Sequence, residues 1–215
     1  KEILYCVKTG AKKFSDNGYK AEVIKFEELM IGNVSKELRN LFFSMTEKKK
    51  NPLASHAKKL SSIGILGAGF MGAGIAEVTL NTGIGIHLKD VQASTLKQAM
   101  SALWKSLNKH VQRKSITRVE AKNAMLYVNG QLDYTNFDKL DIIIEAVFED
   151  MSMKQNILKE VEKYTSSAFI FATNTSALSI EEIGKYAKRP ENVIGLHYFS
   201  PVSKMPLLEI VKTPQ

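Results

Sequence analysis

The chain has 215 residues, of which 44% are hydrophobic and 24% charged, a composition typical of a globular protein. No apolar run reaches the roughly 20 residues of a membrane-spanning helix, and the single cysteine, Cys6, excludes an internal disulfide and favours a reducing compartment. Most of the net charge of +8 lies in residues 1–60, where 13 Lys and Arg stand against 7 Asp and Glu; because no basic motif with interleaved aromatics accompanies it, this charge indicates a solvated helical face and no nucleic-acid partner.

Residues 1–50 are predicted to be helical, because apolar residues recur there at spacings that form a stripe. The stripe consists of Ile24, Phe26, Leu29 and Met30, then Leu38, Leu41, Phe42 and Met45. Ser35 is a candidate cap for the second of these helices. Turns are expected at Gly10, Asn17-Gly18 and Gly32-Asn33.

Residues 48–59 predict a linker, since they contain a run of three lysines followed by Asn51-Pro52. We place a domain boundary near residue 58, which divides the chain into a helical segment 1–58 and a second domain 59–215. The chain begins at Lys1 and not at Met, and we expect it to be part of a longer protein.

Beyond the linker, short apolar runs alternate with longer amphipathic ones. The apolar runs, predicted as strands, are 62–66, 85–88, 142–146, 169–172 and 193–196. The amphipathic segments, predicted as helices, are 70–81, 92–114, 117–128, 151–164 and 179–186. This alternation predicts an α/β fold, a doubly wound and mainly parallel sheet of the Rossmann type covered on both faces.

A glycine-rich turn follows the first predicted strand. Gly67, Gly69 and Gly72 have the G-x-G-x-x-G spacing and open a helix at Phe70-Met71. In such a turn the first glycine makes the bend, the second lets the backbone approach a pyrophosphate, and the third allows close helix–strand packing. The phosphates are expected at the helix amino-terminus, where free N–H groups favour negative charge.

Asp90 follows the next strand about 20 residues further on, where a carboxylate can bind ribose hydroxyls. A carboxylate there would repel a 2′-phosphate, so the cofactor expected is NAD and not NADP. Strand alternation places the neighbouring Lys89 on the other face.

Polar residues follow the later strands at the same edge of the predicted sheet. Glu149 comes after the strand 142–146, with Lys154 one turn into the next helix; a surface lysine is the alternative for Lys154. Residues 174–176, Asn-Thr-Ser, follow the next strand, with a helix-capping turn as their alternative interpretation. Ligands bind beyond the carboxyl ends of parallel strands, so we expect these side chains near the cofactor.

His197 ends the last predicted strand, and Glu209 lies in the apolar segment 207–211 that follows it. If that segment returns beside the strand, Glu209 can accept the second ring N–H of His197 and stabilise its charged form. Such a pair is suited to take a proton from an alcohol while a hydride leaves for nicotinamide.

Four runs together, namely 65–76, 144–150, 174–178 and 197–201, resemble L-3-hydroxyacyl-CoA dehydrogenases, in particular those within multifunctional fatty-acid-oxidation enzymes such as the mitochondrial trifunctional type. The resemblance implies His197 as the catalytic acid–base residue, Glu209 as its partner and Ser176 as a residue that orients the substrate. It also implies NAD contacts, without a metal, from Met71, Asp90, Ala146, Val147, Glu149, Lys154 and Asn174. Ser200 stands where many relatives have Asn.

The resemblance also implies the surroundings of the chain. Residues 1–58 would be the connector after a hydratase domain, and a helical domain that closes the acyl-CoA cleft would follow residue 215. The implied partners are a 3-hydroxyacyl-CoA substrate, these other domains and a thiolase subunit. The implied location is mitochondrial, in the matrix or at the inner membrane, with a peroxisome or a bacterial cytoplasm as alternatives.

Two other functions stay open. One is a beta-hydroxyacid dehydrogenase for another substrate class, which would share the glycine turn but lack the run 197–201. The other is a domain that binds NAD as a scaffold without catalysis, against which the presence of Ser176, His197 and Glu209 argues.

Overall fold

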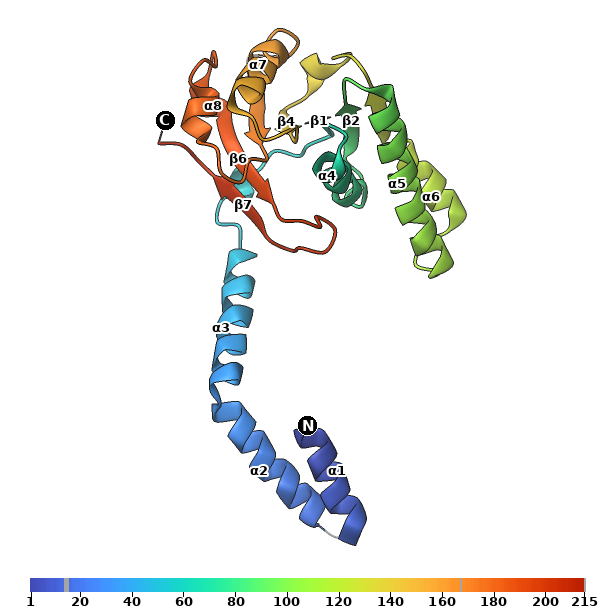
Figure 1. Ribbon diagram of the computed structural model, residues 1–215, viewed down its shortest axis with the longest axis vertical. Coiled ribbons are helices and arrows are strands. Elements are labelled where there is room, and N and C mark those ends of the chain that lie inside the picture. Colours follow the sequence, from blue (N-terminus) through green and yellow to red (C-terminus); the bar gives the residue numbers. More distant parts are fainter. Residues whose placement is uncertain (14–15, 167, 215) are drawn as a thin grey trace. The chain divides into compact units, whose positions relative to one another are not determined.

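The computed structural model describes residues 1–13, 16–166 and 168–214 (Figure 1). The chain divides into two compact units, Lys1–Lys58 and Lys59–Gln215.

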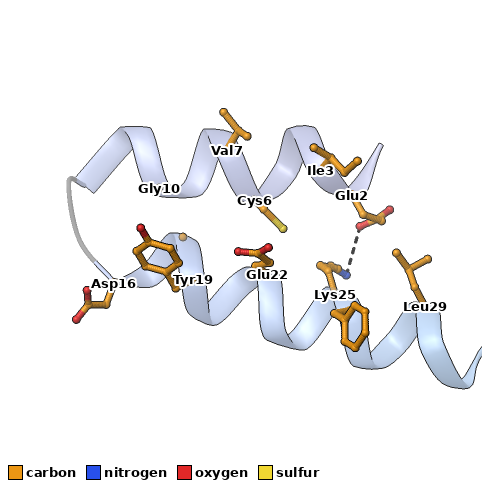
Figure 2. A pocket seen from close by; sticks show the side chains of 12 residues that line it. Glu2, Ile3, Cys6, Val7, Gly10, Asp16, Tyr19, Glu22, Lys25 and Leu29 are labelled. Carbon is orange, nitrogen blue, oxygen red and sulfur yellow. Dashed lines mark ion pairs between the residues drawn. The ribbon is translucent and has the colours of Figure 1, made fainter.

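The first unit consists of α1 (Glu2–Lys13), α2 (Asn17–Ile31), α3 (Asn33–Lys48) and a 3-10 turn η1 (Ala54–His56). Figure 2 shows α1 and α2 lying antiparallel, with the Lys25 ammonium reaching across to Glu2 at 3.7 Å. They enclose a groove of about 660 Å³. The predicted apolar stripe is not buried in this unit, since Ile24, Phe26, Leu38 and Phe42 are each more than half exposed.

Two predicted turns and one predicted cap in this unit are wrong. Gly10 lies within α1, and Asn17-Gly18 begins α2. A side chain on Gly18 would come within 2.8 Å of the Gly10 backbone, so these glycines allow close helix packing. Ser35 lies inside α3, whose cap is Gly32, and its hydroxyl accepts a hydrogen bond from Arg39 instead. Gly32 does separate α2 from α3, as the sequence predicts.

The second unit contains a seven-stranded sheet with the order β3-β2-β1-β4-β5-β6-β7. The strands are β1 (Ser62–Leu66), β2 (Gly85–Lys89), β3 (Val128–Gln131), β4 (Ile142–Glu145), β5 (Ile170–Thr173), β6 (Val193–Tyr198) and β7 (Leu208–Val211). All neighbours are parallel except β7, which runs antiparallel to β6. The prediction of a doubly wound, mainly parallel sheet is confirmed.

Helices cover both faces of this sheet (Figure 1). They are α4 (Phe70–Leu80), α5 (Ala93–Gln112), α6 (Arg118–Met125), α7 (Met151–Val161) and α8 (Ile180–Gly184), with 3-10 turns η2 (Phe137–Lys139) and η3 (Pro190–Asn192). Alternate strand residues point to opposite faces, so Ile65 of β1 packs with α4 and α5, whereas Leu66 packs with α7 and α8. The two apolar clusters hold the sheet between layers of helix.

The predicted elements differ from the structure mainly at their ends. The largest difference is β3, which the sequence does not predict: its first residue, Val128, is expected to end a helix 117–128, and residues 129–131 are assigned to no element. Thr117 does cap α6, through reciprocal hydrogen bonds with Glu120, but that helix ends at Met125. β3 has the sequence Val-Asn-Gly-Gln and only its first residue is buried, so it carries no apolar run by which a strand could be recognised.

Candidate functional site

The order in which the strands are added to the sheet reverses between β1 and β4, which are neighbouring parallel strands. From β1 the strands proceed outward through β2 to β3, and after β3 the chain returns to β4 and continues the other way. The loops that follow β1 and β4 therefore part at the carboxyl edge and leave a crevice there, the usual ligand position in such sheets.

The glycine turn after β1 has the geometry that a pyrophosphate requires. Gly67 has φ +91°, and a side chain on it would lie 2.7 Å from the Ala146 carbonyl oxygen. A side chain on Gly72 would overlap the Gly67 carbonyl oxygen. Beside Gly69, by contrast, there is open space, and this residue caps α4 without any side-chain hydrogen bond. The turn is thus closed where the protein packs against itself and open where an anion could approach the first N–H groups of α4.

Asp90 ties the end of β2 to this turn. Its Oδ2 accepts a hydrogen bond from the Ala68 N–H at 2.8 Å, and its Oδ1 accepts one from Gln92 N–H at 2.9 Å. Asp90 and Gly67 line a small hollow of about 100 Å³, and Gly69 and Phe70 line another of about 310 Å³. Lys89 and Tyr134 line the smaller hollow as well, with the Lys89 ammonium 4.4 Å from the centre of the Tyr134 ring, so Lys89 does not lie apart from Asp90 as strand alternation predicts. The carboxylate of Asp90 is therefore fixed beside the turn by two backbone hydrogen bonds.

Glu149 links the loop after β4 to the loop after β5. Its Oε1 accepts hydrogen bonds from the Thr175 hydroxyl at 2.6 Å, the Ser176 N–H at 3.0 Å and the Ala177 N–H at 3.3 Å. Burial by itself would raise the pKa of Glu149, but the bonds from Thr175 and Ser176 and the charge of Lys154 outweigh it and hold this pKa below its ordinary value. The site therefore contains a carboxylate that stays ionised.

Lys154 is fully buried, so the alternative of a surface lysine is wrong. Its ammonium lies 2.8 Å and 3.0 Å from the two carboxylate oxygens of Glu145 and 3.3 Å from Glu149. The Thr173 hydroxyl donates to Glu145 at 2.7 Å. The structure thus places Lys154 beneath the carboxyl edge of the sheet, and a direct contact with NAD stays a prediction.

Glu145 and Thr173 are not among the site residues that the sequence predicts. The available signal was a carboxylate at the end of the otherwise apolar strand Ile142–Glu145, followed nine residues later by a lysine. A charge at the end of a buried strand needs a partner, and Lys154 was the cation within reach on the next helix.

His197 and Glu209 form the pair that the sequence predicts. They lie opposite each other in the register of β6 and β7, and His197 Nδ1 is 2.8 Å from Glu209 Oε2. The Phe199 ring lies beside the imidazole, with centroids 4.5 Å apart. Asn174 Oδ1 accepts a hydrogen bond from the Tyr198 N–H at 2.9 Å, which joins the end of β5 to the end of β6.

The remaining predicted site residues lie along the same edge. Ala146 donates its N–H to the Leu66 carbonyl, and Val147 donates its N–H to Glu145. Phe70 is largely exposed and Met71 half-buried at the start of α4. Ser176 is exposed in the loop after β5, and its catalytic role, like those of the other site residues, remains a prediction.

Within the described ranges 1–13, 16–166 and 168–214 there is no group of three or more His, Cys, Asp and Glu side chains that could hold a metal ion. Over the same ranges, every helix is too short or too polar to cross a membrane.

The sheet order, the glycine turn and the Asp90 carboxylate define a dinucleotide-binding domain of the Rossmann type. Residues 62–215 match the family model described as the NAD-binding domain of 3-hydroxyacyl-CoA dehydrogenase. The chain therefore belongs to this family, whose cofactor is NAD.

Two relatives extend the likeness over nearly the whole chain. It is 43% identical over 216 residues to a fatty acid oxidation complex subunit alpha of Idiomarina loihiensis and 41% identical over 212 residues to that of Vibrio vulnificus. These alignments cover 99% and 97% of the chain. The chain spans 30% of the length of each relative.

Solved structures with a similar fold include two enzymes of related name. The (S)-3-hydroxybutyryl-CoA dehydrogenase of Ralstonia eutropha aligns with a TM-score of 0.70 and 29% identity, over 73% of this chain and 56% of that one. The 3-hydroxybutyryl-CoA dehydrogenase of Escherichia coli aligns with a TM-score of 0.68 and 31% identity, over 71% and 32%.

Proposed function

We propose that this chain is the NAD-binding part of an enzyme that oxidises (3S)-3-hydroxyacyl-CoA to 3-ketoacyl-CoA in fatty acid beta-oxidation. The observation that carries the proposal is the hydrogen-bonded pair of His197 and Glu209 on the sheet that also holds the glycine turn. The family match and the names of the relatives support the same substrate class.

The pair determines which ring nitrogen of His197 moves the proton. Nδ1 is engaged by Glu209 at 2.8 Å, so Nε2 is the atom that accepts the proton of the substrate hydroxyl. The Glu209 carboxylate then stabilises the imidazolium that forms. Ser176 orients the hydroxyl or the thioester carbonyl of the substrate. NAD, when bound, would accept the hydride from the substrate carbon that carries this hydroxyl group.

The residues that would hold NAD fit that group. Gly67, Gly69 and Gly72 receive the pyrophosphate, and Asp90 receives the adenosine ribose. Glu149 and Asn174 would line the opposite side of the crevice, toward His197; their hydrogen bonds to Ser176 and Tyr198 support this assignment. Contacts from Phe70, Met71, Ala146, Val147 and Lys154 complete the proposed set.

The proposal extends to the longer protein, because the chain spans only 30% of each relative's length. Residues 1–58 would connect a hydratase domain to the dehydrogenase domain 59–215, and a helical domain after it would close the acyl-CoA cleft. The hydratase domain, the helical domain and a thiolase subunit are the proposed partners. Both relatives are bacterial, which supports the bacterial cytoplasm over the mitochondrion among the expected locations.

Titration calorimetry of the 215-residue chain with NADH tests the cofactor site, and we expect saturable binding. The substrate class is tested in the longer protein by comparing oxidation of 3-hydroxybutyryl-CoA with that of simple hydroxyacids. Preference for the CoA ester supports the proposal; preference for free hydroxyacids would point to another dehydrogenase class. Binding without any dehydrogenase activity would instead indicate a scaffold domain.

A further inference from the structure

A fully buried carboxylate, that of Glu145, lies at the end of β4, beneath the carboxyl edge of the sheet. Glu145 has no exposed surface, yet both its oxygens are satisfied. They accept hydrogen bonds from Lys154 on α7, from Thr173 on β5 and, at 2.8 Å, from the N–H of Val147 in the turn after β4. Three elements that diverge at this edge are therefore tied to one side chain.

Lys154 also contacts a second carboxylate, that of Glu149. Its buried ammonium contacts Glu145 at 2.8 Å and Glu149 at 3.3 Å. The Glu149 side chain is 36% exposed, whereas the Lys154 side chain has no exposed surface. One cation thus bridges an internal carboxylate and an external one.

Glu149 in turn holds the backbone that presents the predicted site residues. It accepts hydrogen bonds from the N–H groups of Ser176 and Ala177. Asn174 and Ser176 belong to the same loop, directly after β5. A displacement of Glu149 would therefore release that loop.

We propose that Glu145 is a positioning residue: by holding Lys154 it keeps Glu149 in place, and through Glu149 it sets the loop 174–177 that carries Asn174 and Ser176. The inference rests on the proposed function, since it assumes that this loop serves the cofactor and substrate. Stability alone does not account for the buried pair, because well-packed apolar residues commonly replace such pairs without loss.

The test uses Glu145→Gln in the 215-residue chain, a change that keeps the shape of the side chain and removes its charge. Lys154 is then left with Glu149 as its acidic partner and draws it away from the loop. Hydrogen exchange of the Ser176 and Ala177 amides should accelerate about tenfold more than that of the Leu158 and Val161 amides in α7. The dissociation constant for NADH should rise about tenfold.

Glu182→Gln is the matched control. Glu182 pairs with Lys185 on the surface of α8, at 3.4 Å, with both side chains more than half exposed. This variant removes the same charge without touching the cluster, so amide exchange and NADH affinity should match those of the unmodified chain. Equal acceleration of all four amides in Glu145→Gln would show general destabilisation and would overturn the proposal, as would unchanged exchange at Ser176 and Ala177.

Thr173→Val provides a second test if Glu145→Gln does not fold. It removes the hydroxyl that donates to Glu145 at 2.7 Å and leaves every charge in place. The same two amides should exchange faster, by about threefold, and no selective change would again contradict the proposal. Because amide exchange is measured without NADH, it tests the positioning role even if the chain were to bind no cofactor, an outcome that would count against the proposed function alone.

Discussion

At the scale of single residues, Glu149 is a carboxylate that the fold keeps ionised against the effect of burial. Its lowered pKa has a consequence for stability. A group whose folded pKa lies below its unfolded value contributes stability above the unfolded value, 4.5 for this residue, and that contribution is lost as the pH falls through the folded pKa. The stability that Glu149 contributes is therefore present at neutral pH and lost in acid.

We predict that Glu149→Gln flattens the acid limb of the stability profile below about pH 4.5. Thr175→Val removes the hydroxyl that donates to Glu149 and should flatten it partly, while the charge remains. Urea unfolding at a series of pH values measures the free energy of unfolding for each variant. An acid limb as steep in Glu149→Gln as in the unmodified chain would contradict the assignment.

Glu209 is a residue whose effect should be confined to catalysis. In Glu209→Gln the amide can donate to Nδ1 of His197, which would place the ring proton on Nε2, the atom that must accept one. We expect oxidation of 3-hydroxyacyl-CoA by the longer protein to slow by about a hundredfold. NADH affinity should not change, since Glu209 lies on the edge strand β7, from which β1 and its glycine turn are separated by β4, β5 and β6.

Stopped-flow measurement of NADH formation with saturating NAD checks this prediction. Glu191→Gln, an exposed carboxylate in η3, is the control and should retain the full rate. A Glu209→Gln variant with the unmodified rate would remove the pair from the proposed mechanism.

At the scale of elements, the sequence predicted best where one physical signal dominated. The strand cores of β1, β4 and β6 are apolar and buried on both faces, so their apolar runs identified them. The glycine turn was predictable because its spacing is tied to backbone geometry at Gly67 and Gly72. The return of β7 beside β6 was inferable because Glu209 offered His197 a charged partner.

Elements fixed by tertiary contacts were harder to predict. β3 is an edge strand whose place is set by pairing with β2, and its own residues give no strand pattern. Gly10 and Gly18 look like turn residues in the sequence, but glycine is needed at these positions because α1 and α2 approach each other closely there. The role of Glu145 depends on residues 9 and 28 positions away, Lys154 and Thr173, which only folding brings together.

The glycine turn offers a matched pair of substitutions at the start of α4. A methyl group at residue 72 would overlap the Gly67 carbonyl oxygen, which is backbone and cannot move aside, whereas one at residue 69 meets open space. We therefore predict that Gly72→Ala lowers the free energy of unfolding by about 2–3 kcal/mol, whereas Gly69→Ala changes it by less than about 0.5 kcal/mol.

Of the two variants, Gly69→Ala should leave stability nearly unchanged but weaken NADH binding. Gly69→Ala should weaken NADH binding by at least about tenfold, because its methyl group would stand where the pyrophosphate approaches. Urea unfolding and fluorescence titration of both variants check the two halves of the prediction. Tight NADH binding by Gly69→Ala would move the cofactor away from this turn.

At the scale of the whole molecule, every predicted site residue belongs to the second unit. The loops after β1, β2, β4 and β5 and the paired strands β6 and β7 all contribute to one edge of its sheet. The first unit instead leaves many large apolar side chains exposed, among them Ile3, Phe26 and Phe42. Because residues 62–215 match the NAD-binding family, we predict that cofactor binding is confined to the second unit.

This division predicts the outcome of limited digestion with trypsin. Residues 49–59 are all exposed, contain Lys49, Lys50, Lys58 and Lys59, and form no regular structure other than the 3-10 turn η1. We expect early cleavage in this segment, with accumulation of a fragment that begins near residue 60. Mass spectrometry identifies the fragment, and the undigested chain taken through the same purification is the control.

The fragment should bind NADH about as tightly as the control, because the glycine turn, Asp90 and the Glu145 cluster all remain in it. Its dissociation constant should stay within about twofold of the control, well below the tenfold change that one lost interaction of about 1.4 kcal/mol would cause. A fragment that folds but binds NADH more than about tenfold more weakly would show that residues 1–58 contribute to the cofactor site.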